Sequence, residues 1–150
     1  MQSFAVLLTA ALLPMKHALS AYFAYIFLGA VGLPVFSSFT GGIGTFVGPT
    51  GGYLFGFFLT IIVIRLVISR FGRGKASMTA AFLLGTATLY IFSAVYYSAV
   101  YLGKLELSSV IGAFTLCVLP FVPFDMIKLV LAVVLARRLE RVVLIESEKI

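Results

Sequence analysis

The sequence has few of the groups that carry out enzyme chemistry. It contains one histidine, one cysteine and five acidic residues among 150. A single cysteine, Cys117, excludes an internal disulfide. The single histidine, His17, lies in a short loop, and the sequence shows no Ser/His/Asp set and no cluster of metal ligands. The lysine of a GxxxxGK[ST] phosphate loop is absent as well. The sequence therefore argues against an enzyme and predicts neither a metal site nor a cofactor.

Charged residues are also scarce. They make up 11% of the chain and hydrophobic residues 62%, whereas a soluble domain is about a quarter charged and about half apolar. We therefore predict an all-α integral membrane protein that forms one domain over residues 1–150. The net charge of +6 gives no reason to expect a nucleic-acid partner. The basic residues cluster in short gaps between apolar runs, where Lys and Arg set the orientation of a protein in the lipid bilayer.

The apolar runs predict five membrane segments. A spanning helix needs about 20 apolar residues, and four of the runs approach this length. The last is expected to break near Pro120 and Pro123, because proline interrupts the helical hydrogen bonds. The five segments cover residues 3–13, which is the short one, 18–36, 51–69, 78–102 and 107–136.

The loops between these segments predict an orientation. Cytoplasmic loops favour Lys and Arg, so Lys16, residues 70–75 and residues 137–141 are expected inside, together with the C-terminus. Residues 37–50 and 103–106 are then expected outside. Five segments would place the N-terminus outside, although the first has only about half the required length. We therefore expect a further N-terminal helix in the natural protein, or a truncated chain.

Asp125 and Lys128 lie inside the last apolar segment. A charge at the bilayer centre costs about 2.5–3.5 kcal/mol, so both should face the protein interior, and their i, i+3 spacing puts them on one helical face. They could form a structural ion pair that locks two helices, or a site for a polar ligand. Pro120 and Pro123 favour the site, because broken backbone at membrane depth is tolerated where it lines a cavity.

A Gly-rich, uncharged loop, residues 37–50, leads into the predicted membrane segment at residues 51–69. Gly48, Gly52 and Gly56 are spaced four apart, and on a helix they would form a smooth stripe where another backbone can approach closely. The stripe could serve a helix crossing alone. Together with the loop, whose glycines permit tight turns, it could instead form a lid over a site.

Three tyrosines share one face of the segment at residues 78–102. Tyr97 and Tyr101, near its outer end, are expected in the interfacial aromatic belt. Tyr90 lies deeper in the segment and is therefore a candidate for the wall of a pocket.

Three stretches of the chain resemble one transporter family. FAVLLTAALL, YIFLGAVGLPVFSSFTGGIGTFVGPTGGYLFGF and VLPFVPFDMIK resemble the BioY family, the biotin-binding S-components of energy-coupling factor (ECF) transporters. GLPVF followed by the Gly-rich loop and GPTGGY is highly specific, and Pro-Phe-x-Pro-x-Asp-x-x-Lys is nearly as specific. The family's first helix is missing here, and Ser37-Ser38-Phe39 stands where many members carry more glycine.

The resemblance implies a six-helix S-component bundle, of which five segments are visible, that captures biotin from outside. It implies a transmembrane coupling subunit and two ATPases as partners, with ATP used by those partners. Asp125 and Lys128 are then expected to help bind biotin, and Tyr90 to pack against it. The same site would be shaped by Ser38, Thr40, Gly41, Gly42, Gly48, Pro49, Thr50, Gly51, Gly52 and Tyr53.

Two alternatives stay open on the sequence. The chain could be an S-component for another small vitamin. It could also be a structural or assembly membrane protein in which Asp125 and Lys128 form an internal ion pair.

Overall fold

The computed structural model describes residues 2–103 and 106–147, and all regular secondary structure in these ranges is helical. The predicted all-α architecture is therefore confirmed. The long and short helices are α1 (Gln2–Leu12), α2 (Met15–Ala30), α3 (Gly44–Val47), α4 (Gly51–Phe71), α5 (Lys75–Tyr96), α6 (Leu107–Cys117) and α7 (Val122–Ser147). Short turns of other helical types are η1 (Ser37–Phe39), η2 (Tyr97–Tyr101, a π-helix) and η3 (Leu119–Phe121).

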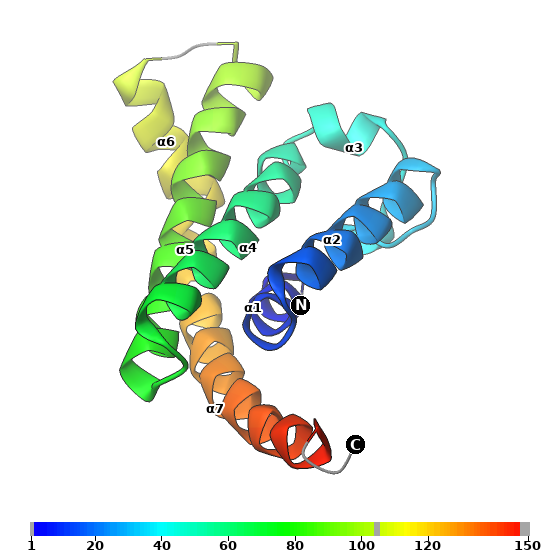
Figure 1. Ribbon diagram of the computed structural model, residues 1–150. Helices are drawn as coiled ribbons and strands as arrows, with labels where there is room; N and C mark the ends of the chain where they lie inside the picture. Colours follow the sequence, from blue (N-terminus) through cyan, green and yellow to red (C-terminus); the bar gives the residue numbers. More distant parts are fainter. Residues whose placement is uncertain (1, 104–105, 148–150) are drawn as a thin grey trace.

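The antiparallel pair α4 and α5 forms the centre of the molecule (Figure 1). On one side of this pair, α1 packs against both α4 and α7, and α2 packs against α4. On the other side, α6 runs along the end of α5 and leads into α7 (Figure 1). From there α7 continues away from α6 toward the C-terminus (Figure 1). The helices α1, α5 and α7 therefore contact one another.

Three helical runs within the described residues are long and apolar enough to cross a membrane: Gly51–Phe71, Lys75–Val100 and Leu107–Glu140. The chain is thus a multi-pass membrane protein. The predicted segment 18–36 is longer than the helix found there, because α2 has 16 residues and ends at Ala30. At 1.5 Å per residue α2 spans about 24 Å, less than the hydrocarbon core of about 30 Å.

The predicted break near Pro120 is confirmed. α6 ends at Cys117, Pro120 lies in η3, and α7 begins at Val122. Pro123 therefore falls in the first turn of α7, where its missing N–H costs no hydrogen bond. The break places Asp125 in the same first turn.

The predicted glycine stripe is wrong at Gly48. This residue is extended, with φ −77° and ψ 179°, and α4 begins only at Gly51. The next residue is Pro49, and the residue before a proline is biased away from the helical region. The stripe on α4 therefore consists of Gly52 and Gly56.

These two glycines allow α4 to approach α5 closely, which confirms a helix crossing. A Cβ atom on Gly52 would lie 3.0 Å from the Cα and carbonyl oxygen of Ser93. Two turns further along α4, the Thr60 hydroxyl lies 2.9 Å from the carbonyl of Gly56 and 3.2 Å from that of Gly85, and it donates between the two helices. Small residues and an interhelical hydroxyl are the usual means of tight packing between membrane helices.

The loop between α2 and α4 folds back on α2 instead of extending from it. The Phe36 ring occupies the space where a Cβ on Gly29 would be, and the Gly42 amide donates a 2.7 Å hydrogen bond to the Gly29 carbonyl. Within η1, Ser38 and Phe39 both adopt left-handed backbone angles, with φ 58° and 57°. The loop thus has a defined conformation anchored by an aromatic side chain.

Candidate functional site

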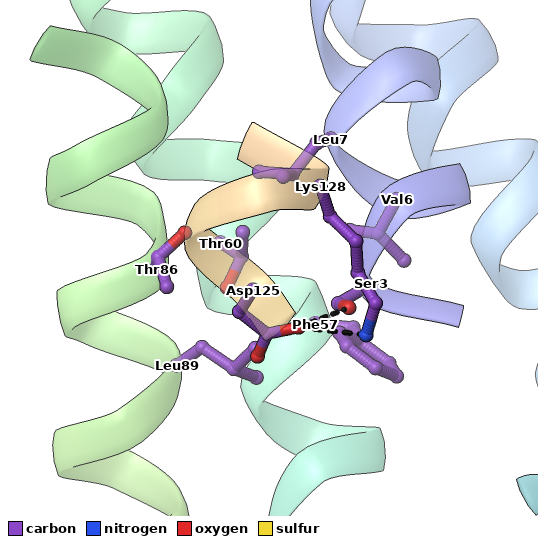
Figure 2. Close-up of a pocket in the computed structure, with 9 residues that line it drawn as sticks. All are labelled: Ser3, Val6, Leu7, Phe57, Thr60, Thr86, Leu89, Asp125 and Lys128. Atoms are coloured by element: carbon purple, nitrogen blue, oxygen red, sulfur yellow. Dashed lines mark hydrogen bonds and ion pairs between the residues drawn. The ribbon is translucent and has the colours of Figure 1, made fainter. Parts of the chain in front are cut away.

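Asp125 is the centre of the polar cluster at the start of α7. It is 7% exposed, and its carboxylate accepts three hydrogen bonds. Oδ1 accepts from Lys128 Nζ at 2.8 Å and from the Ser3 hydroxyl at 3.2 Å, and Oδ2 accepts from the Tyr90 hydroxyl at 2.7 Å. Figure 2 shows Asp125, Lys128 and Ser3 pointing toward one another from α7 and α1.

The local sequence explains why α7 presents this pair. Because α7 begins at Val122, Asp125 lies in the first turn, where the helix dipole favours a negative charge. Lys128 follows one turn later on the same face and forms an ion pair with Asp125 at 2.8 Å. The prediction that both face the protein interior is confirmed.

Tyr90 reaches Asp125 from α5. Its side chain is buried, and its hydroxyl donates to the carboxylate across a separation of 35 residues. Tyr90 is thus placed at the polar cluster, and its contact with a ligand stays a prediction.

A cavity of about 10 Å³ lies beside this cluster, where α1, α4, α5 and α7 meet (Figure 2). Space of this size holds about one water molecule. Its walls combine apolar side chains with hydroxyls and the ion pair. They are formed by Ser3, Val6, Leu7, Phe57, Thr60, Thr86, Leu89, Asp125 and Lys128.

A larger groove of about 200 Å³ separates α1 from α2. Gln2 lies at this groove and connects three elements. Its Nε2 donates to the Tyr25 hydroxyl at 2.6 Å and lies 3.4 Å from the Val35 carbonyl, while its Oε1 accepts from the Ser37 hydroxyl at 3.0 Å. The first turn of α1 is therefore attached to the loop as well as to Asp125.

The loop residues predicted for the site do not line the cavity at Asp125. Gly51 and Gly52 instead pack α4 against its neighbours: a Cβ on Gly51 would overlap the Phe46 carbonyl. The Tyr96 hydroxyl also donates to that carbonyl, at 2.6 Å, which ties the loop to α5. A role in ligand binding stays a prediction for Ser38, Thr40, Gly41, Gly42, Gly48, Pro49, Thr50, Gly51, Gly52 and Tyr53.

The opposite end of the bundle is basic. Arg73 and Glu140 form an ion pair of 2.7 Å between the α4–α5 turn and α7. Arg65 Nη1 donates at 3.4 Å to the carbonyl of Ala11 in the last turn of α1, where a cation is favourable. Regions predicted to share the cytoplasmic side thus lie at one end of the molecule.

In the described part of the chain, no three side chains of His, Cys, Asp or Glu are grouped to hold a metal ion.

Ser3 is the member of the cluster that the sequence did not reveal. It lies in the short first segment, 122 residues from Asp125. A serine among apolar residues carries no signal for a partner so distant in sequence. Only the packing of α1 against α7 brings the two together.

Comparison with known proteins places this arrangement in a family. The model of the BioY family matches residues 1–144. The chain belongs to the BioY family. The resemblance that the sequence motifs suggested is thereby confirmed.

Curated BioY proteins match most of the chain. It is 40% identical over 141 residues to the biotin transporter BioY of Thermotoga maritima, covering 94% of this chain and 79% of the relative. It is 36% identical over 143 residues to the probable biotin transporter BioY of Pyrococcus horikoshii, covering 93% and 78%.

A solved structure has the same fold. The crystal structure of the S-component for biotin from an ECF-type ABC transporter matches with a TM-score of 0.80 and 28% sequence identity. The match covers 93% of this chain and 74% of the solved one. The chain therefore shares its fold with that S-component.

Proposed function

We propose that the protein binds biotin as the membrane S-component of an ECF-type uptake transporter. The observation that carries the proposal is the ion pair between the buried Asp125 and the half-buried Lys128, held at 2.8 Å at the start of α7 in a chain of the BioY family. Ionisable groups inside membrane helices mark ligand and transport sites more often than lipid-facing surface. The protein itself performs no reaction, and ATP is hydrolysed by other subunits.

The chemistry of the cluster suits biotin. The ureido ring of biotin offers two N–H donors and a carbonyl, and its tail ends in a carboxylate. Asp125 accepts a ureido N–H, and Lys128 donates either to the ureido oxygen or to the carboxylate of the tail. Tyr90 holds the Asp125 carboxylate in position through Oδ2. Charge-assisted bonds of this kind are the strong ones in a site shielded from water.

The orientation follows from the distribution of charge. The end of the bundle that carries Arg73 and Glu140 faces the cytoplasm, together with the C-terminus. The loop between α2 and α4 then faces outside, where the substrate arrives. Residues 1–150 act as a substrate-binding unit that delivers biotin to a transmembrane coupling subunit driven by two ATPases.

One observation favours a different role. The hydrogen bonds from Ser3 and Tyr90 to Asp125 join α1 and α5 to α7, which is what an internal lock between these helices requires. In that case the pair would stabilise the bundle without touching a ligand.

Equilibrium binding of labelled biotin to the purified protein in detergent separates the two roles. We expect saturable, tight binding that unlabelled biotin displaces and that other small vitamins do not. Binding of another vitamin in place of biotin would show an S-component with a different substrate. A folded protein that binds none of these vitamins would support the alternative role, in which the Asp125–Lys128 pair only stabilises the bundle.

A further inference from the structure

We propose that the first turn of α1 is a latch, in which the Ser3 hydroxyl occupies the acceptor on Asp125 that a ligand N–H takes over on binding. This inference rests on the proposed function, because it concerns how biotin gains access to that carboxylate. Gln2 holds the same turn to the loop. Release of the turn opens the site.

The three bonds to Asp125 differ in length. A hydroxyl donating to a carboxylate usually lies about 2.5–2.7 Å from it, and an ammonium about 2.7–2.9 Å. Tyr90 at 2.7 Å and Lys128 at 2.8 Å are at or near these ranges. Ser3 at 3.2 Å is far outside its range. The Ser3 bond is therefore the weakest of the three and the first that a competing donor replaces.

The cavity requires that one of its walls moves. Its volume of about 10 Å³ holds about one water molecule, so a two-ring ligand fits beside Asp125 only if side chains or a helix of the wall move. The wall is made by α1, α4, α5 and α7. α4 and α5 are fixed to each other by close backbone packing and by the Thr60 hydroxyl.

α1 contributes the Ser3 hydroxyl to this wall. On its other side it borders the groove of about 200 Å³ toward α2, which leaves it space to move away from Asp125. Its first turn is held by side chains, through Ser3 to α7 and through Gln2 to Tyr25 and Ser37.

Ligand binding then exchanges one hydrogen bond for another on Oδ1. A ureido N–H replaces the Ser3 hydroxyl, while Tyr90 remains on Oδ2. The free protein is mostly latched, so the observed affinity is reduced by the fraction of molecules in which the latch is open. Removing the Ser3 hydroxyl raises that fraction.

The test measures association and dissociation rate constants of labelled biotin for the wild type and for Ser3→Ala. We expect Ser3→Ala to bind roughly threefold to tenfold more tightly, the range of one modest hydrogen bond. The gain appears in the association rate constant, and the dissociation rate constant is unchanged. Ser3→Thr, which keeps the hydroxyl, behaves like the wild type.

Ser20→Ala is the matched control. Its hydroxyl donates at 2.9 Å to the Lys16 carbonyl on the exposed side of α2, so its loss leaves both rate constants unchanged. Gln2→Ala provides a second, independent test, because it removes the other hold on the same turn. It should also raise the association rate constant.

The outcomes separate the latch from the proposed function. Wild-type protein that does not bind biotin overturns the proposed function itself. Wild-type protein that binds, with Ser3→Ala binding equally or more weakly, overturns the latch and leaves the function in place. Slower association in Gln2→Ala also overturns the latch. Ser3→Cys, which keeps the size of serine with a weaker donor, gives a smaller gain and serves if the alanine variant does not fold.

Discussion

The Tyr90 hydroxyl donates a 2.7 Å hydrogen bond to Oδ2 of Asp125, and this contact joins α5 to the first turn of α7. The acceptor is a buried carboxylate. Hydrogen bonds to charged groups contribute more to stability than bonds between neutral groups. The contact therefore affects both the stability of the bundle and the orientation of the carboxylate.

Replacing Tyr90 by Phe should lower the free energy of unfolding by about 1.5–3 kcal/mol, because a charged acceptor loses one donor. Tyr96→Phe is the matched control. It removes a bond of 2.6 Å to a neutral acceptor, the Phe46 carbonyl, and should cost about 0.5–1.5 kcal/mol. Thermal unfolding in detergent measures both, and an equal or larger loss for Tyr96→Phe would contradict the assignment.

Asp125→Asn keeps the shape of the side chain and removes its charge. If Asp125 accepts a biotin N–H, affinity should fall roughly tenfold to a hundredfold while the protein stays folded. If the pair is an internal lock, the half-buried Lys128 loses its counterion and the cost appears instead as a loss of stability, at most about 3–5 kcal/mol, the range for fully buried pairs.

Titration with labelled biotin and a thermal unfolding curve on the same preparation distinguish these results. Glu106→Gln is the control, since Glu106 is exposed at the start of α6. It makes the same chemical change away from the site and should alter neither affinity nor stability.

Gly52→Ala should destabilise the bundle by about 1–3 kcal/mol, the usual range for overpacking a close contact. The added Cβ lies 3.0 Å from backbone atoms of Ser93, which cannot rotate away. Gly74→Ala is the control, because a Cβ there has no atom within 4 Å. Equal unfolding temperatures for the two variants would mean that α4 and α5 adjust freely.

The Arg73–Glu140 pair should contribute little to stability. Arg73 is 42% exposed, and exposed ion pairs contribute about 0.2–1 kcal/mol, screened by salt. A double-mutant cycle with Arg73→Ala and Glu140→Ala, measured at low and high salt, should give a coupling energy in this range that falls as salt rises. A large, salt-independent coupling would contradict this expectation.

Of the residues in the polar cluster, the sequence indicated Asp125, Lys128 and Tyr90 but not Ser3. Asp125 and Lys128 could be assigned to one helical face because i, i+3 spacing fixes that geometry. Tyr90 could be proposed from its depth in an apolar segment. Ser3 could not, because its contact depends on how α1 packs against α7, 122 residues away.

The errors have similar causes. The prediction that Gly48 belongs to a helical stripe is wrong because Pro49 disfavours the helical conformation of the residue before it. The predicted segment 18–36 continued past the end of α2 because residues 31–36 are apolar. Of those residues, Phe36 is buried because it folds back against Gly29, whereas Val31 and Leu33 are exposed. Hydrophobicity therefore shows neither where a helix ends nor which element a side chain packs against.

The unbroken course of α7 from Val122 makes it a lever. Asp125 is in its first turn, and Glu140 lies 15 residues later in the same helix, a separation of about 22 Å at 1.5 Å per residue. A tilt of about 10° around Asp125 would move Glu140 by about 4 Å on that length. That displacement exceeds the 2.7 Å of the contact between Arg73 and Glu140. A tilt of α7 about Asp125 would therefore separate Glu140 from Arg73 at the basic end of the bundle.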